Sequence, residues 1–399
     1  MRLAVVIQRF AADVTGGAEY HARRVAEHLA AAGHDVTVLT STARSTRGAW
    51  DDHYPAGVSR DGALTVLRFR TRRRARRNLE RVRESLRRLT RRSPVSLRQI
   101  WSMWANPYVP ELIAHLRAEG HRYDAVLFFT YFHYPSLVGA LVTRTVRIGI
   151  PLAHDDAEIA TPAVRRMLLA FDAILANTEE ERALVQQVLG LETRPITVAG
   201  CGVDPPPEPL PPPPIATPYV VYLGRAKDGT EDLAACIAEF HRRFGDEVFE
   251  ASDGTTFPGR ALSLVTVGEL RLAAPGVRSV AHVDPTERWA WTAGAQVLVN
   301  PSLFESLSLT LLEAWWVGRP VLARAQCHVM ARQVERAGGG ATFSDAASFA
   351  DALATMLRSR AARAAMGERG RAYAQERYAW PAVIEQYLRV LASTVTARS

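Results

Sequence analysis

Two glutamates in the segment PSLFESLSLTLLEAWWVGRPV, residues 301–321, are the residues whose types and spacing most directly suggest chemistry. From Ser308 onward, a run of apolar residues predicts a mostly buried helix, which the following glycine and proline end. Glu305 precedes this helix and Glu313 lies inside it. An unpaired buried carboxylate is costly, so Glu313 needs either a polar partner or a cavity that a ligand fills.

The first turn of that helix is a candidate anion site. Side chains on a helix lean toward its N-terminus, so we expect Glu313 to reach back toward the first turn. The backbone N–H groups of Leu307, Ser308 and Leu309 have no partner within the helix there, and they can hold an anion. A phosphate-bearing ligand at this point would meet both glutamates. The spacing alone is also compatible with a loop acid at Glu305 and a helix-start acid at Glu313 that the helix dipole favours.

The full run of residues 301–321 resembles the E-x7-E segment of the retaining glycosyltransferases of family 4, which have the GT-B fold. The resemblance implies that Glu305 lies beside the transferred sugar and that Glu313 hydrogen-bonds the ribose of the nucleotide. It also implies an α/β chain with two Rossmann-like doubly wound domains facing a central cleft. The match extends to the residues around the two glutamates, and this favours the family over two ordinary surface acids.

The size and composition of the chain fit two domains. It has 399 residues, 48% of them hydrophobic, which is enough for two cores of ordinary size. The start, MRLAVVIQRF, does not resemble a signal peptide, and no apolar run is long enough for a transmembrane helix. Cys201, Cys236 and Cys327 are odd in number and far apart, which argues against a disulfide framework or a Cys-based metal site. These features predict a cytoplasmic protein.

The net charge of +8 is concentrated in one segment. Residues 68–98 hold fourteen arginines against two glutamates, so the rest of the chain is mildly acidic. Within the segment, apolar residues recur at intervals of three and four: Leu79, Val82, Leu86 and Leu89. This spacing predicts an amphipathic helix with arginines on its outer face.

Three interpretations of this basic helix are open. It can be a solvated helix whose leucines cover the core of the N-terminal domain. It can also dock on anionic lipid at the inner membrane face, which would suit a peripheral membrane enzyme with a lipid-linked acceptor. The arginines expected to make that contact are Arg72, Arg73, Arg74, Arg76 and Arg77. Nucleic acid binding is the third interpretation, but it normally comes with a recognisable reading module, so we predict no nucleic acid partner.

The N-terminal half has the alternation of a parallel doubly wound sheet. Strands are expected at residues 3–7, 36–39, 125–129, 147–151, 173–176 and 196–198, and helices at 18–32, 110–118 and 179–189. In such sheets, ligands bind beyond the carboxyl ends of the strands. Residues that follow the strands are therefore the candidates for a site.

Two features at those strand ends resemble sites of the family. Gly16 and Gly17 follow the first strand and resemble the N-terminal glycine loop, which lies against the donor phosphate and the acceptor; a plain turn is the alternative. His154 and Asp155, in IPLAHDD, resemble a His-Asp pair near the reacting sugar. The resemblance makes His154 a candidate catalytic residue, whereas a lone histidine is more often structural.

The proline-rich segment DPPPEPLPPPP, residues 204–214, is a stiff spacer that fits neither a core helix nor a central strand. We place the domain boundary there. The predicted organisation is an N-terminal acceptor-binding domain at 1–204, a linker at 205–214, a C-terminal nucleotide-sugar-binding domain at 215–378, and a last helix at 379–399. By resemblance to the GT-B fold, that helix crosses back to the first domain.

The second domain opens with a strand at 219–223, and Arg225 follows it where the family has an arginine for the pyrophosphate. The family lysine, about five residues later, falls on Thr230. Lys227 is the only lysine in the chain. Either Lys227 reaches the phosphates from a shortened loop, or Arg225 works without its usual partner. Further strands are expected at 262–267 and 297–300, and helices at 348–357 and 380–391.

Together, the residues and the resemblance predict a retaining, metal-independent glycosyltransferase of the hexosyltransferase type. It would move a sugar from a nucleoside diphosphate sugar to a hydroxyl acceptor, which is a glycan, a lipid-linked precursor or a secondary metabolite. Arg225, Lys227 and the helix amides would stabilise the leaving diphosphate. Two alternatives are another GT-B enzyme, such as an epimerase or pseudo-glycosyltransferase, and a non-enzymatic binding protein that uses the basic helix.

Overall fold

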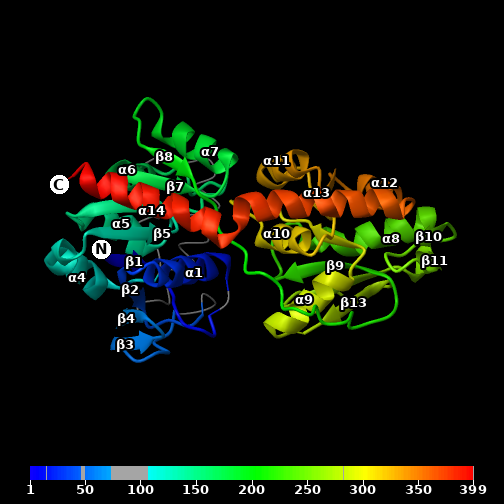
Figure 1. Ribbon diagram of the computed structural model, residues 1–399, viewed down its shortest axis with the longest axis horizontal. Coiled ribbons are helices and arrows are strands. Elements are labelled where there is room, and N and C mark those ends of the chain that lie inside the picture. The colour runs from blue at the N-terminus through cyan, green and yellow to red at the C-terminus, as the bar shows by residue number, and fades with distance from the viewer. Residues whose placement is uncertain (15, 46–49, 73–106, 282, 399) are drawn as a thin grey trace, which may run out of the picture. The chain divides into compact units, whose positions relative to one another are not determined.

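The computed structural model (Figure 1) describes residues 1–14, 16–45, 50–72, 107–281 and 283–398. Contacts divide the chain into two units, Met1–Gly202 with Val383–Ser399, and Val203–Ala382. The last helix, α14 (Trp380–Thr396), begins in the second unit and continues in the first. Residues 205–214, which we predicted to be a linker, fall within the second unit.

The first unit is built on an eight-stranded sheet of order β3-β4-β2-β1-β5-β6-β7-β8. Its pairs are parallel except for the β3-β4 hairpin. The bounds are β1 (Arg2–Val6), β2 (Asp35–Ser41), β3 (Gly57–Asp61), β4 (Leu64–Phe69), β5 (Ala125–Phe129), β6 (Val146–Ile150), β7 (Ala173–Ala176) and β8 (Ile196–Val198). The central strands are continuous apolar runs because both faces of a parallel sheet are covered by helices.

The helices of the first unit are α1 (Gly17–Ala31), α4 (Pro110–Glu119), α5 (Tyr134–Val142), α6 (Pro162–Ala170) and α7 (Glu179–Leu189), with a short 3-10 turn η1 (Gly120–Arg122). The apolar faces of α4, α5, α6 and α7 pack on the sheet in one core, in which the rings of Phe128 and Phe171 lie 5.9 Å apart. The C-terminal helix contacts α1, since Tyr387 is fully buried and its hydroxyl hydrogen-bonds His21 at 2.9 Å. Burial lowers the pKa of His21 to about 3, so this contact uses a neutral imidazole.

The prediction of a helix beginning at residue 68 is wrong at its start, because Arg68 and Phe69 lie in β4. The strand has the sequence LTVLRF and pairs with β2, and its residues Leu64 and Val66 are buried. Arg72, one of the proposed membrane-contacting arginines, pairs with Glu111 of α4 at 2.6 Å. The rest of the expected basic helix, including Arg73, Arg74, Arg76 and Arg77, lies outside the described residues.

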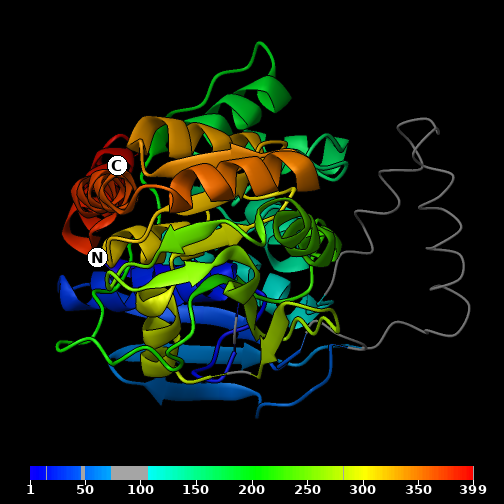
Figure 2. The same ribbon diagram turned by 90° about the vertical axis from the view of Figure 1, so that its right-hand side faces the viewer.

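The second unit has a six-stranded parallel sheet of order β13-β12-β9-β14-β15-β16 and a small antiparallel pair, β10 and β11. The strands are β9 (Tyr219–Gly224), β10 (Val248–Glu250), β11 (Thr256–Pro258), β12 (Ser263–Gly268), β13 (Val277–Val280), β14 (Val297–Asn300), β15 (Val321–Arg324) and β16 (Gly340–Phe343). The helices are α8 (Leu233–Phe244), α9 (Pro285–Gly294), α10 (Leu309–Trp316), α11 (His328–Ala337), α12 (Ala346–Leu357) and α13 (Arg360–Tyr378), with 3-10 turns η2 (Thr230–Asp232) and η3 (Gly259–Ala261). Figure 2 shows α11 and α12, in orange, packed along the strands of this sheet.

The helix predicted after Ser308 is confirmed as α10, and its residues Leu311, Leu312, Ala314 and Trp315 are buried. Trp315 donates its indole N–H to the carbonyl of Gly339 at 2.8 Å, so the polar atom of this fully buried ring has a partner. None of the three cysteines, Cys201, Cys236 and Cys327, forms a disulfide. Within the described parts of the chain, no helix has the length and apolarity needed to cross a membrane.

Candidate active site

The loop that carries Glu305 lies between β14 and α10, and Asn300 holds both of its ends. The side-chain oxygen of Asn300 accepts from the backbone N–H of Ser302 at 3.0 Å, and its amide nitrogen donates to the Ser308 hydroxyl at 2.9 Å. Asn300 is buried. A buried amide is costly unless both its oxygen and its nitrogen are hydrogen-bonded. Asn300 therefore favours the loop arrangement that satisfies both atoms, and the loop is pre-formed.

A buried arginine fixes the start of the same loop. Arg324 ends β15, and it donates to the carbonyls of Pro301 at 3.4 Å and Ser344 at 2.9 Å. It also forms an ion pair with Asp232. These partners define the position of the buried guanidinium, because losing Asp232 would leave its charge uncompensated and losing a carbonyl would leave an N–H without a partner. The sequence analysis missed this residue, whose only signal is a charge at the end of an otherwise apolar strand.

A second loop, which follows β9, packs directly against the Glu305 loop. Gly229 has φ +97°, and a Cβ there would lie 2.1 Å from the carbonyl oxygen of Pro301. The hydroxyl of Thr230 donates to the carbonyl of Lys227 at 2.7 Å and accepts from the N–H of the same residue at 3.2 Å. Thr230 is buried, and its side chain closes the turn that presents Lys227.

The two loops bring Lys227 and Glu305 together. The Lys227 Nζ lies 2.5 Å from Glu305 Oε1, with 37% and 17% of the two side chains exposed. Arg225 is exposed nearby in sequence, and its carbonyl accepts from the Tyr222 hydroxyl at 2.6 Å, which fixes its backbone. Among the described residues, no ion pair is found for the Arg225 guanidinium. This edge of the sheet therefore presents two cations beside one carboxylate.

Glu313 has the polar partner that its burial requires, in Arg288 of α9. The Arg288 guanidinium lies 2.5 Å from Glu313 Oε2. Burial raises the pKa of Glu313 above its ordinary value, and the charge of Arg288 opposes this shift. Among the described residues, no hydrogen bond joins Glu313 to the first-turn amides, so the expected backward reach of the carboxylate is replaced by a contact with α9.

The N-terminus of α10 is left without a side-chain cap. Ser308 precedes the helix, but its hydroxyl accepts from Asn300 and does not bond to the first-turn amides. Leu307 and Ser308 are buried and Leu309 is half-buried. Uncapped N–H groups and the helix dipole make this end attractive to an anion.

The first unit places His154 just beyond the carboxyl end of β6. Its ring is half-buried and meets the edge of the Tyr131 ring, with centroids 6.4 Å apart. Tyr131 hydrogen-bonds Asp156, and Asp155 is exposed. Two residues just beyond neighbouring strand ends have left-handed backbones although neither is glycine: Thr130 has φ +70° and Leu152 has φ +54°.

Gly16 and Gly17 lie at the start of α1, beside the carboxyl end of β1. A Cβ on Gly16 would lie 2.1 Å from a carboxylate oxygen of Glu19, whereas one on Gly17 would meet nothing within 4 Å. Glu19 is buried and accepts from Gln8 at 2.9 Å and from Arg9 at 2.5 Å. The glycine loop therefore lies on a buried ion pair that the sequence analysis did not find.

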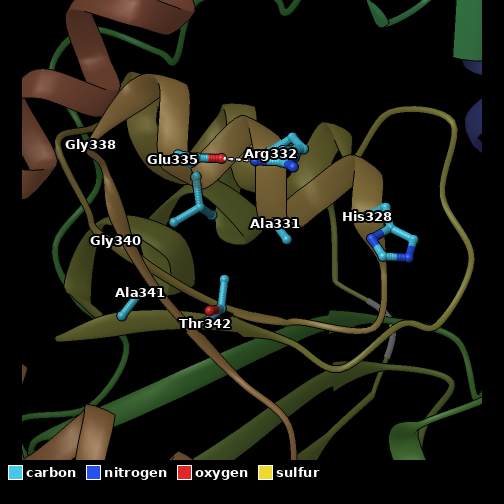
Figure 3. Close-up of a pocket in the computed structure, with 9 residues that line it drawn as sticks. His328, Ala331, Arg332, Glu335, Gly338, Gly340, Ala341 and Thr342 are labelled. Carbon is cyan, nitrogen blue, oxygen red and sulfur yellow. Dashed lines mark hydrogen bonds and ion pairs between the residues drawn. The ribbon is translucent and has the colours of Figure 1, made fainter. Parts of the chain in front are cut away.

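The predicted site residues thus gather at two sheet edges, one in each unit. Arg225, Lys227, Thr230, Glu305, Leu307, Ser308, Leu309 and Glu313 lie at the carboxyl ends of β9 and β14 or on α10, and Gly16, Gly17 and His154 lie beyond β1 and β6. A separate groove of about 540 Å³ lies between α11 and β16 and is lined by none of them (Figure 3). Its charged residues Arg332 and Glu335 pair with each other at 2.6 Å. The described residues contain no cluster of three or more His, Cys, Asp or Glu arranged to hold a metal.

Two Rossmann-like units with polar residues beyond their strand ends are typical of α/β proteins that bind ligands there, and family comparisons identify the class more closely. Residues 15–206 match the family model Glycosyltransferase Family 4, and residues 217–359 match Glycosyl transferases group 1. The chain therefore belongs to the family 4 (group 1) glycosyltransferases of the GT-B fold.

Several solved structures are similar to the chain in fold. Sucrose-phosphate synthase from Thermosynechococcus elongatus has 19% identity and a TM-score of 0.69, with 100% of both chains covered. Anabaena HepE in complex with UDP has 14% identity and a TM-score of 0.67, covering 98% of this chain and 100% of HepE. The trehalose-6-phosphate synthase OtsA has 11% identity and a TM-score of 0.70, covering 98% and 99%. No curated protein matches the chain in sequence.

Proposed function

We propose that this glycosyltransferase is a retaining enzyme that moves a hexose from a nucleoside diphosphate sugar to a hydroxyl acceptor without a metal. The observation that carries the proposal is the contact between Lys227 and Glu305, formed by residues far apart in sequence beside the uncapped start of α10. At this sheet edge, the cations and the helix amides suit a diphosphate, and the carboxylate suits the hydroxyl groups of a sugar. HepE binds UDP and UDP-glucose, which makes a UDP-sugar the first donor to test.

Arg225, Lys227 and the first-turn amides of α10 would bind the diphosphate. Negative charge grows on the leaving phosphate as its bond to the anomeric carbon breaks, and fixed positive groups at that place lower the barrier. Two cations and a helix N-terminus supply in this way the charge that a metal supplies in other enzymes. Thr230 acts indirectly, by holding the turn that presents Lys227.

Glu313 would accept a hydrogen bond from the ribose, and the charge of Arg288 opposes the rise in the pKa of Glu313 that burial causes. Glu305 would orient the donor sugar. In the free protein its carboxylate is engaged by Lys227, so diphosphate binding that draws Lys227 toward the phosphates also releases Glu305 toward the sugar. The Lys227–Glu305 contact thereby links donor binding to the orientation of the donor sugar by Glu305.

On the first unit, His154 would contact the sugar or stabilise positive charge at the anomeric carbon, and Gly16 and Gly17 would let the backbone approach the acceptor and donor phosphate. The acceptor oxygen attacks on the face that the diphosphate leaves. Its proton passes to an oxygen of the leaving phosphate, so no protein side chain serves as general base. For a lipid-linked acceptor, the basic segment would contact the anionic membrane surface.

The test is calorimetric binding of UDP, GDP, ADP and dTDP, each with and without magnesium, followed by turnover with the matching sugar donor. We expect selective binding of one nucleotide at equal affinity in both conditions, and an anomeric configuration in the product that equals that of the donor by NMR. The substitution Arg225→Ala should weaken binding, and Arg332→Ala, in the separate groove, is the matched control. A strict magnesium requirement, inversion of configuration, or no nucleotide binding at all would contradict the proposal.

A further inference from the structure

Glu181 is a buried carboxylate that bridges the ends of two neighbouring strands in the first unit. It lies in the first turn of α7 and is 1% exposed. Its Oε1 accepts from the backbone N–H of Ala153 at 2.5 Å, and its Oε2 accepts from the backbone N–H of Asn177 at 2.6 Å. Ala153 follows β6 and Asn177 follows β7, and these strands pair in the sheet. One side chain therefore joins two strand ends at their carboxyl edge.

The turn that Glu181 holds is a strained one. Leu152 has φ +54°, a left-handed backbone that a leucine rarely adopts. Such a conformation persists only where the surrounding contacts enforce it. The hydrogen bond from Ala153 to Glu181 falls directly after Leu152 and directly before His154. On its other side, the end of β6 is held by the residue that follows β5, since Thr130 donates its N–H to the carbonyl of Ile150 at 2.9 Å.

The side chain of Glu181 is itself fixed in place. Thr178 caps α7, and its hydroxyl accepts from the N–H of Glu181 at 3.1 Å. Burial raises the pKa of Glu181 to about 7, and the backbone amides that it accepts from oppose this shift. Glutamine has the same shape as glutamate but carries an NH2 group in place of one oxygen. Because the two amides bind different oxygens of Glu181, one of them would face this NH2 group in glutamine.

We propose that Glu181 is a positioning residue, which sets the place of His154 by tying the turn at residues 152–154 to α7 and to the end of β7. The inference rests on the proposed function, since it assumes that the place of His154 matters for transfer. Glu181 itself touches no substrate in this account. A small displacement of a group at the reacting centre is enough to slow transfer strongly.

The variant Glu181→Gln tests this, with Glu179→Gln as the matched control. Glu179 lies in the same helical turn, but it is exposed and pairs with Arg182. With both variants folded by circular dichroism, we expect Glu181→Gln to lower kcat about 10- to 100-fold while leaving the donor KM within about twofold. The control should keep both constants. If Glu181→Gln does not fold, Glu181→Asp replaces it, because the shorter carboxylate cannot span both amides.

A second readout does not depend on activity. In spectra of protein labelled with ¹⁵N-histidine, the signal of His154 is assigned through its loss in His154→Asn. We expect this signal to move in Glu181→Gln and to stay in place in Glu179→Gln. An unmoved signal, or an unchanged kcat in an active enzyme, overturns the role of Glu181. If the wild type transfers no sugar, the proposed function fails, and the His154 signal still decides whether Glu181 holds the turn.

Discussion

Lys227 and Glu305 lead to opposite predictions for the binding of a nucleoside diphosphate. In the free protein, the Lys227 ammonium is 2.5 Å from the Glu305 carboxylate. A lysine that binds the diphosphate has to share or leave that carboxylate. Removing Lys227 should therefore weaken diphosphate binding, whereas removing the charge of Glu305 should strengthen it.

The size of each effect follows from the exposure of the pair. A hydrogen bond to a charged group contributes about 1.5–3 kcal/mol, so Lys227→Met should weaken binding roughly 10- to 150-fold. The pair itself is partly exposed, at 37% and 17%, and such pairs contribute about 0.2–1 kcal/mol after screening. Glu305→Gln should accordingly tighten binding by about 1.5- to 5-fold. In the Lys227→Met background, Glu305→Gln should have no effect, because the competition is gone.

The assay is calorimetry of the wild type, both single variants and the double variant, with the nucleoside diphosphate that binds the wild type best. The corresponding nucleoside, which lacks phosphate, is the control ligand, and its affinity should not depend on Lys227. Equal diphosphate affinity in all four proteins would refute the assignment of Lys227 to the phosphates. A gain from Glu305→Gln that persists without Lys227 would refute the competition between the carboxylate and the ligand.

Three further predictions concern other residues of the two units. Glu313→Ala should weaken nucleotide binding at least about tenfold, whereas Glu305→Ala should bind nucleotide yet transfer no sugar; equal behaviour of the two in calorimetry and turnover would refute their different roles. Gly229→Ala places a Cβ 2.1 Å from the carbonyl oxygen of Pro301, at a φ of +97°. It should lower the free energy of unfolding by about 1–3 kcal/mol in urea titrations. An unchanged urea midpoint would contradict this. Burial raises the pKa of Glu181 from 4.5 to about 7, so folding binds a proton between these values and wild-type stability falls as pH rises through them. Relative to Glu181→Gln, the wild type should lose roughly 3 kcal/mol between pH 4.5 and pH 8, and parallel pH profiles would contradict this.

The strands of the parallel sheets were predictable because burial on both faces leaves a local signal. The strands expected at residues 125–129, 173–176, 196–198 and 297–300 have those bounds in the structure. Three of them are short, fully buried runs, whereas residues 196–198 are half-buried, and helix segments separate these strands along the chain. The hairpin of β3 and β4 was not predicted. Its pairing with β2 is a contact between distant segments, and the arginine-rich composition after residue 68 favoured a helix there.

The candidate site was predictable only in part, because the sequence does not show which residues contact the predicted ones. Glu305, Glu313 and Lys227 stand out by motif or by rarity in the sequence. Arg288 pairs with Glu313, and Arg324 supports the Glu305 loop, but neither arginine belongs to a motif. The contacts of Arg324 span up to 92 residues along the chain. Composition and spacing report on neighbours along the chain. They carry no signal for a salt bridge between helices or strands that meet only after folding.

The two units fix their strand-end sites by different physical means. The loop of the second unit is shaped by close approach, since only a glycine at 229 leaves room for the carbonyl of Pro301. The edge of the first unit instead keeps two non-glycine residues, Thr130 and Leu152, in left-handed conformations. The turn at Leu152 persists for two reasons. Leu152 is only 9% exposed and belongs to the core, and Glu181 binds the amide of the following residue. A turn that is held by packing on one side and by a buried carboxylate on the other has one defined position, and the residue that this turn positions is His154.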